Sequence, residues 1–266
     1  MNEIITSLQN PQVKIWRSLN KSRSARLEFG LFLAEGEHMV GEALKENKVR
    51  ALLIDERARE KYSALAENAQ SVSVYYLSAH VIEALCDAKT PQGIIAVCDY
   101  PTENDLTDPG NYLVALDGVQ DPGNVGTVLR TMDAAGYTAL LMDDKTADPY
   151  APKALRATMG AAFRIPACRC DLSQTLHGLA EKGYEIIAGD LHGEPFYQRR
   201  KAKDKICIVI GNEGQGISPA VFQEATMRLK IPIVGQAESL NAAVAGAVMM
   251  YDFLREHLEE NNKSDC

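Results

Sequence analysis

Features that would assign this 266-residue chain to several familiar classes are missing from its sequence. No run approaches the ~20 apolar residues of a membrane span, and the opening MNEIITSLQN lacks the charged start and apolar core of a signal peptide. Six cysteines stand mostly inside apolar runs, at 86, 98, 168, 170, 207 and 266, with no C-x-x-C pair. We therefore expect a cytoplasmic protein with reduced, buried thiols and neither a metal site nor a disulfide framework.

The two common phosphate-binding glycine motifs are also missing. The glycines of ICIVIGNEGQG, residues 206–216, follow an apolar strand-like run but have the spacing G-x-x-G-x-G, and no Lys completes a P-loop. Ligands of open α/β sheets usually bind at the carboxyl ends of strands, so this cluster indicates a ligand site. A plain turn explains it equally well, because glycine is the commonest residue wherever φ is positive.

Basic residues are outnumbered, and the net charge of −8 argues against a general binder of polyanions. The stretch KIWRSLNKSRSAR nevertheless contains no acid, and its cations are Lys14, Arg17, Lys21, Arg23 and Arg26. It also holds the only tryptophan, Trp16, which would either stack on an unpaired RNA base or pack with Ile15 and Leu19 in a local core. A second basic run, QRRKAKDK at 198–205, reads as a solvated loop.

Short strands alternate with helices in two series, which predicts an α/β protein with two domains. The first series has strands at 31–36, 49–55, 72–77 and 93–99 and helices at 37–47, 56–68 and 78–87. A polar, proline-containing linker follows at 100–111. The second series has strands at 112–117, 138–143, 167–170, 184–190, 206–211 and 228–232, and helices at 125–136, 152–163, 173–182, after 218 and from about 240. Such alternation predicts a mainly parallel sheet covered on both faces.

Loops that join strands to helices carry the polar residues of the second series. Asn124 is placed to cap a helix on which Arg130 lies off the apolar stripe, as a solvated cation three residues before Asp133. Ser239 or Asn241 is placed to begin the last helix. The small residues of that helix predict a closely packed neighbour, most simply another helix.

Three long segments resemble, in order and spacing, the signature motifs of one enzyme family. DPGNVGTVLRT, IVIGNEGQGIS and LKIPIVGQAESLNAAVAGAVMMYD are similar to those of the SpoU (TrmH-like) RNA 2′-O-ribose methyltransferases of the SPOUT superfamily. PYAPKALRATMGAAFRIP between the first two also looks like the family, and FLAEGEHMVGEAL resembles the L30e-like substrate-binding domain often attached to it. Three ordered motifs are far more specific than one glycine pattern.

The resemblance implies the domain plan. It implies an L30e-like RNA substrate-binding α/β domain at 1–99, the linker at 100–111 and a SPOUT methyltransferase domain at 112–266 with a parallel sheet and a deep trefoil knot. It also implies a homodimer through the catalytic domain, for which the small-residue face Ala242, Ala245, Gly246 and Met249 of the last helix would suit a tight contact.

The resemblance further implies S-adenosylmethionine as cofactor and a ribose 2′-hydroxyl of RNA as methyl acceptor, without a metal. The cofactor residues it indicates are Gly211, Gly214, Gly216, Ile231, Leu240 and Asn241, whose bare glycine backbone would let main-chain groups approach the ligand. The catalytic residues it indicates are Asn124, Arg130, Glu213, Ser239 and Asn241. Because arginine seldom gives up its proton, Arg130 suits the stabilisation of an alkoxide or a grip on phosphate better than the role of a base.

Several functions remain open at this point. The attached domain favours large-subunit (23S) ribosomal RNA over transfer RNA, by analogy with the family. A catalytically inactive RNA-binding protein on the same scaffold is a second alternative, although it would have no reason to keep all five catalytic positions. A nicotinamide-dependent oxidoreductase is disfavoured by the missing G-x-G-x-x-G.

Overall fold

The chain packs as two compact units in the computed structural model, which describes residues 4–69, 72–101 and 108–264. The first unit contains residues up to 102 together with 148–164, and the second contains 103–147 and 165–266. Most of the predicted linker, 102–107, lies outside the described residues. No helix in the described part of the chain is long and apolar enough to cross a membrane.

A mixed five-stranded sheet forms the centre of the first unit, in the order β1-β4-β3-β5-β2. These strands are β1 (Ile4–Ile5), β2 (Leu31–Glu35), β3 (Val49–Asp55), β4 (Ser73–Leu77) and β5 (Ile94–Asp99). The helices around it are α1 (Pro11–Leu19), α2 (Arg23–Phe29), α3 (Glu37–Lys45), α4 (Ser63–Asn68) and α5 (Ala79–Glu83). The strands predicted between 31 and 99 are confirmed within two residues at each end.

The helix predicted over 56–68 is wrong as a single element. It is divided into a 3₁₀ turn, η1 (Glu56–Ala58), and the short α4. Between them lies Tyr62, which is buried and whose hydroxyl donates a hydrogen bond of 2.8 Å to the Gln92 carbonyl. Anchoring this side chain in the core overrides the helical preference of the local sequence.

Helices α1 and α2, which the sequence reading did not predict, contain the acid-free basic stretch. The buried side of α1 is Val13, Trp16 and Leu19, and the Trp16 ring meets that of Tyr75 edge-on at a centroid distance of 5.4 Å. Trp16 is therefore a core residue, so the hypothesis that it stacks on an RNA base is wrong. Its indole cannot leave the core without exposing the apolar surface around it.

Arg26 must also be removed from the predicted RNA-binding set. It is 3% exposed, and its Nε donates to Asp148 Oδ2 at 2.8 Å while a second nitrogen donates to the Leu19 carbonyl. A buried charge needs such partners to offset the loss of hydration. The other four cations, Lys14, Arg17, Lys21 and Arg23, are exposed or half-buried.

Residues 148–164 pack within the first unit, so the predicted boundaries 1–99 and 112–266 do not describe them. The rings of Tyr150 and Phe163 lie 4.9 and 6.0 Å from that of Phe32, which explains the placement by apolar burial. The helix predicted over 152–163 is also interrupted. It forms α7 (Pro152–Thr158) and a 3₁₀ turn, η2 (Ala161–Phe163), separated by positive φ at Met159 and Gly160.

The second unit is built on a six-stranded sheet that is parallel throughout, as predicted. Its order is β11-β9-β10-β6-β7-β8. The strands are β6 (Tyr112–Asp117), β7 (Ala139–Met142), β8 (Ala167–Arg169), β9 (Glu185–Pro195), β10 (Ile206–Gly211) and β11 (Met227–Lys230). Both faces are apolar because helices cover both.

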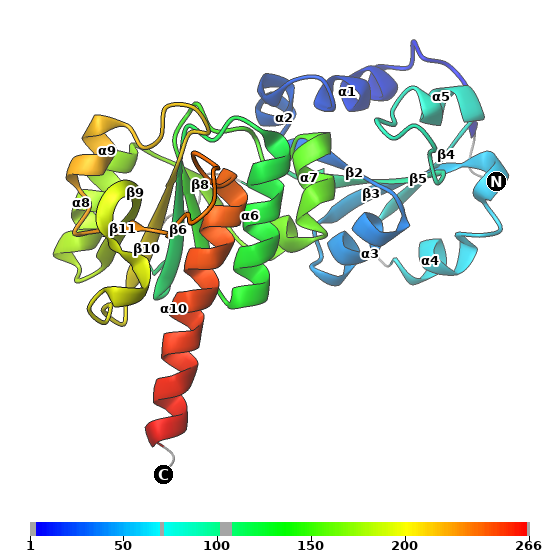
Figure 1. The fold of residues 1–266 in the computed structure, drawn as a ribbon. Coiled ribbons are helices and arrows are strands. Elements are labelled where there is room, and N and C mark those ends of the chain that lie inside the picture. The colour runs from blue at the N-terminus through cyan, green and yellow to red at the C-terminus, as the bar shows by residue number, and fades with distance from the viewer. Residues whose placement is uncertain (1–3, 70–71, 102–107, 265–266) are drawn as a thin grey trace. The chain divides into compact units, whose positions relative to one another are not determined.

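Two pairs of helices cover this sheet. The long α10 (Ala242–Ser264) packs beside α6 (Pro122–Ala135) on one face (Figure 1). The other face packs against α8 (Leu172–Glu181) and α9 (Pro219–Gln223) through a core that includes Leu113, Leu141 and Val209. The strand order reverses between β6 and β10, where Gly211 is in register with Asp117. Such a switch point is where open α/β sheets bind ligands.

Of the cysteines, Cys98, Cys168 and Cys207 are buried as free thiols. Burial raises the pKa of the Cys98 and Cys207 thiols, which keeps them protonated and unreactive. The threading of the chain through a trefoil knot stays a prediction from the resemblance.

Candidate active site

A tight glycine hairpin follows β10. Asn212 and Gly216 exchange two backbone hydrogen bonds of 2.9 Å, and the Asn212 side-chain oxygen accepts from the amides of Gly214 and Gln215. A Cβ atom on Gly211 would lie 2.4 Å from both Gly216 C and Ile217 N. Gly211 is thus required because the hairpin folds back against it, and Gly216 because its φ is +70°. The hairpin itself thus accounts for glycine at these two positions, and the approach of a ligand to their backbone stays a prediction.

The end of β6 is tied to this hairpin. Asp117 is 6% exposed, and one of its carboxylate oxygens accepts from the Ser218 amide at 2.6 Å. The Asn212 side-chain amide donates to the Gly118 carbonyl at 2.7 Å. These bonds fix the loops after β6 and β10 to each other, and a site built on them is preorganised.

Three predicted catalytic residues form one hydrogen-bonded chain. The Asn124 amide donates to Glu213 Oε1 at 2.8 Å, and the Asn241 amide donates to Asn124 Oδ1 at 3.0 Å. Asn241 also caps α10 by accepting from the amides of Ala243 and Val244. The prediction that Asn241 can begin the last helix is confirmed. The prediction that Asn124 caps α6 is wrong, because Asp121 does so through the Gly123 amide, and this leaves the Asn124 side chain for Glu213.

Opposing effects set the charge state of Glu213. Desolvation raises its pKa, but the Asn124 amide and the backbone amides of Gln120 and Asp121 stabilise the carboxylate more strongly. The net result is a lowered pKa, so Glu213 is ionised at neutral pH. A charged Glu213 holds Asn124 in one orientation and, through it, Asn241.

A cavity of about 610 Å³ opens beside the hairpin. Five of the six predicted cofactor residues line it, Gly211, Gly214, Gly216, Ile231 and Leu240, together with the predicted catalytic residues Glu213 and Ser239. Asn241, the sixth, does not line the cavity but adjoins it through the chain of hydrogen bonds with Asn124. The structure thus brings together residues from three loops that are far apart in sequence.

Part of the lining, Gly189, Asp190 and Leu191, was not predicted. These residues lie where β9 departs from β11, whose register shifts between Arg228 and Leu229. A Cβ on Gly193 would lie 2.6 Å from Arg228 backbone atoms, so the strands rejoin only because Gly193 has none. The two glycines in AGDLHGE were a usable signal of this departure.

The small residues of α10 do not form a free face for a second protomer. Ala242, Ala245, Gly246 and Met249 all line the cavity, and a Cβ on Gly246 would lie 2.4 Å from Ile210 Cδ1. Their small size admits β10 and the cavity rather than another helix, which corrects the predicted dimer contact. The exposed side of α10 instead presents Val244, Tyr251 and Leu258, which are about half exposed.

Arg130 does not line the cavity. It is exposed on α6, on the same side as Thr127 and Ala134 and away from the buried stripe of that helix. Among the described residues, no hydrogen bond or ion pair within one chain joins Arg130 to the other four predicted catalytic residues.

In the second basic run, the prediction of a solvated loop is wrong at Arg199. The Arg199 side chain is 3% exposed, pairs with Asp252 and Glu256 at 2.8 and 3.0 Å and lies over the ring of Phe253. Arg200 pairs with the fully buried Glu185. These ion pairs hold the segment to α10 and β9, and they bury the Arg199 side chain while the Arg200 side chain stays 57% exposed.

A parallel α/β unit with a preorganised cavity at its switch point defines a class, the cofactor-binding α/β enzymes. The chain belongs to the SpoU rRNA methylase family, which matches residues 111–251. The MRM3-like substrate-binding domain matches residues 10–96.

Relatives of known name match over nearly the full length. The chain is 36% identical to the 23S rRNA (guanosine(2553)-2′-O)-methyltransferase RlmP of Bacillus subtilis, over 93% of this chain and 97% of that protein. An rRNA methyltransferase of Sinorhizobium meliloti, solved with S-adenosylmethionine bound, is 32% identical with a TM-score of 0.83, over 96% and 98% of the two chains. The SpoU methyltransferase AviRb of Streptomyces viridochromogenes, also with that cofactor, is 26% identical with a TM-score of 0.83, over 94% and 99%.

Proposed function

We propose that this protein uses S-adenosylmethionine to methylate a ribose 2′-hydroxyl in RNA. The observation that carries the proposal is the charge of the cavity. Asp190, Glu213 and Glu238 line it, and its lining, all within the described residues, includes no Lys, Arg or His. Such a site disfavours phosphate-bearing cofactors and suits a cationic one, because its carboxylates would repel phosphate and attract a sulfonium.

The cavity also suits this cofactor in size and in the kinds of atom that line it. Its volume lies within the range of about 300–1,000 Å³ typical of small-molecule sites. Ile231, Leu240 and the hairpin glycines would hold the cofactor between apolar side chains and main-chain polar groups. When bound, it supplies an activated methyl group with its own leaving group, so no metal is needed.

The remaining chemistry falls to side chains of the protein. Glu213, Asn124 and Asn241 hold the loops of the site in one arrangement, and Ser239 lies at the cavity wall. Arg130 keeps its proton, so its role is to stabilise the developing alkoxide of the ribose or to grip the adjacent phosphate. Alignment of the 2′-oxygen with the methyl group and removal of one proton complete the requirements.

The substrate we propose is 23S ribosomal RNA, handled in the cytoplasm. The relative in Bacillus subtilis is named for that RNA, and the MRM3-like domain match supports a separate substrate-binding unit. Mass-spectrometric mapping of ribose methylation in RNA from cells with and without the gene tests this directly. Loss of one methylated site in 23S RNA is the expected result. A lost site in transfer RNA alone would replace the substrate, and no lost site would favour an inactive RNA-binding protein.

The basic stretch of α1 and α2 should dock the RNA. Replacing Lys14, Arg17, Lys21 and Arg23 by Gln is expected to weaken RNA binding and to reduce the slope of log affinity against log salt by ~0.7–0.9 for each phosphate that is no longer neutralised. Filter binding at several salt concentrations measures both. A control with Lys48, Lys89, Lys145 and Lys182 changed to Gln, all exposed and outside both basic runs, alters the net charge equally. Equal behaviour of the two variants would show that only total charge matters.

The second unit should form a homodimer through the exposed sides of α6 and α10. These helices pack together, and Val244, Tyr251 and Leu258 form an apolar stripe with seven-residue spacing. A two-fold contact there would bury the stripe and place Arg130 of each protomer at the interface. Tyr251→Glu is expected to give a monomer by light scattering at micromolar concentration, whereas Tyr197→Glu, at another exposed tyrosine, keeps the dimer. A monomeric parent protein would refute the contact.

A further inference from the structure

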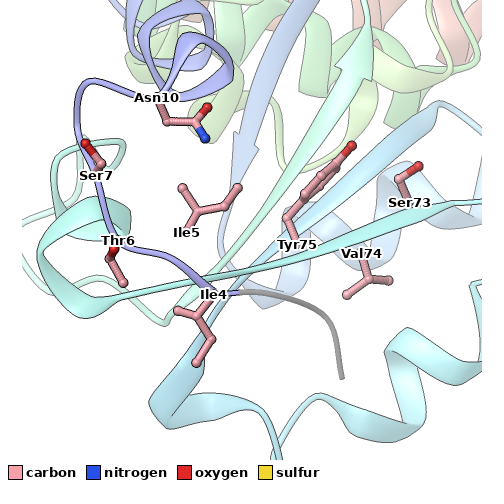
Figure 2. A pocket seen from close by; sticks show the side chains of 8 residues that line it. All are labelled: Ile4, Ile5, Thr6, Ser7, Asn10, Ser73, Val74 and Tyr75. Carbon is pink, nitrogen blue, oxygen red and sulfur yellow. The ribbon is translucent and has the colours of Figure 1, made fainter.

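A second cavity lies in the first unit, at the edge of its sheet. It has a volume of about 670 Å³ and is lined by Ile4 and Ile5 of β1, Thr6, Ser7 and Asn10 before α1, and Ser73, Val74 and Tyr75 of β4. Figure 2 shows these side chains around the cavity. The SpoU site described above does not include any of them.

The lining has a distinctive chemistry. Its described residues include no charged side chain, only aliphatic groups, one aromatic ring, three hydroxyl side chains and one amide. A free phosphate or metal ion therefore finds no counter-charge here. A flat, uncharged molecule with a polar edge fits such a lining, because aliphatic and aromatic groups cover its faces while amide and hydroxyl groups meet its edge.

Tyr75 is held in place as a stacking surface. Its ring is half-buried, packs on the core of the first unit and is braced edge-on by Trp16. A ring that is already fixed loses little conformational entropy when a second ring stacks on it. Trp16 thus contributes indirectly, by positioning Tyr75.

Asn10 supplies the polar edge. Its side-chain oxygen accepts from the Gln12 amide and caps α1, which fixes the orientation of the amide group. Its side-chain nitrogen has no hydrogen-bond partner within the described part of the chain, and neither has the Tyr75 hydroxyl. Both groups are therefore available to the edge of a ligand.

The charge beside the cavity indicates the source of the ligand. Asn10 begins α1, whose exposed Lys14 and Arg17 belong to a stretch without acids. A neutral cavity next to a cationic helix matches a nucleotide in a chain, with its base in the cavity and neighbouring phosphates on the helix. We infer that this cavity binds one unpaired base of the RNA substrate, stacked on Tyr75 and hydrogen-bonded by Asn10. The inference rests on the proposed action on RNA.

The test uses the full-length protein, a mixed-sequence single-stranded 12-nucleotide RNA and the corresponding 12-base-pair duplex. Tyr75→Leu removes the stacking ring, and its affinity for the single strand is expected to fall between about five-fold and a hundred-fold. Duplex affinity and the salt slope of single-strand binding stay unchanged, because the Tyr75 ring neutralises no phosphate. Tyr75→Phe keeps the ring and is expected to stay close to the parent protein.

Asn10→Ser keeps the helix cap but lacks the amide donor, so it tests the cavity without touching the core. We expect a several-fold loss of single-strand affinity with an unchanged melting temperature. Photo-crosslinks from 4-thiouridine in the single strand should map to Tyr75 or its neighbours.

Three results would overturn the inference: parental single-strand affinity in both Tyr75→Leu and Asn10→Ser, equal losses for single strand and duplex, or crosslinks confined to other segments. Displacement of bound RNA by an extended peptide that adds to the edge of β1 would likewise assign the cavity to a protein partner. S-adenosylmethionine binding and the mapped methylation site report on the proposed function separately, so either can fail alone.

Discussion

Arg130→Ala is expected to lower methyl transfer about 100-fold to 1,000-fold while leaving S-adenosylmethionine affinity nearly unchanged. This expected loss of rate is the one typically measured when an enzyme loses one preorganised group that stabilises charge in the transition state. The cofactor should be unaffected because Arg130 is exposed on α6 and does not line the cavity. Stability should change by less than about 0.5 kcal/mol, as for most exposed positions. Single-turnover kinetics and calorimetry of cofactor binding measure the two effects.

Two further variants sharpen this result. Arg130→Lys keeps the charge but not the planar fork of donors, so partial activity would indicate a purely electrostatic role and full loss a bidentate grip. Lys182→Ala removes an exposed cation of the same unit, away from α6 and α10, and should be close to the parent protein. If cofactor affinity falls as steeply as turnover in Arg130→Ala, the assigned role is wrong.

Gly211→Ala is expected to abolish measurable cofactor binding and to lower the free energy of unfolding by about 1–3 kcal/mol, the usual cost of overpacking. The added methyl would overlap main-chain atoms of Gly216 and Ile217 at 2.4 Å, and these cannot rotate away as a flexible side chain would. The hairpin must therefore open, which displaces Glu213 and the cavity wall together. Calorimetry with S-adenosylmethionine and urea unfolding measure the two losses.

Two glycines with different surroundings serve as controls. A Cβ on Gly214 would lie 3.7 Å from Asn212 Oδ1, an ordinary van der Waals distance, so Gly214→Ala should keep the fold. Gly178 lies in α8, where an added methyl group would meet no atom within 4 Å, and Gly178→Ala should stabilise the protein by roughly 0.5–1 kcal/mol. If both controls were also strongly destabilised, the effect of Gly211→Ala could not be assigned to overlap with the hairpin backbone.

Buried apolar runs made the strands of both units predictable. Segments such as ICIVIG and YLVALD have no polar residue within their apolar runs, which is typical of strands that are buried on both faces of a sheet. The helices α1 and α2 were not predicted. The helical spacing of their apolar positions, such as Val13 and Leu19 in α1, is interrupted by many cations, and the segment was interpreted by its charge. The break at Tyr62 depends on a partner 30 residues away, which no local pattern reports.

The site was predicted as a set of residues rather than as an arrangement. Sequence motifs located Gly211, Ile231 and Leu240, which do share one cavity. The sequence did not show why position 211 has to be glycine. The hairpin backbone folds back so closely that a side chain at Gly211 would overlap it, and this is visible only in the folded structure. Likewise, the small residues of α10 signalled a close neighbour but not that the neighbour is β10.

The packing of residues 148–164 with the first unit has a consequence for how such a protein evolves and can be engineered. A gene fragment cut at the linker, such as one encoding 105–266, would carry Tyr150 and Phe163 away from the aromatic partner Phe32 and leave them in water. Newly exposed apolar surface of this kind promotes aggregation. Recombination at the linker alone would therefore join residues 148–164 of one protein to the first unit of another, against which they have not evolved to pack. Exchange of substrate-binding modules between relatives has to transfer this short internal segment as well, as a matched pair of non-contiguous pieces.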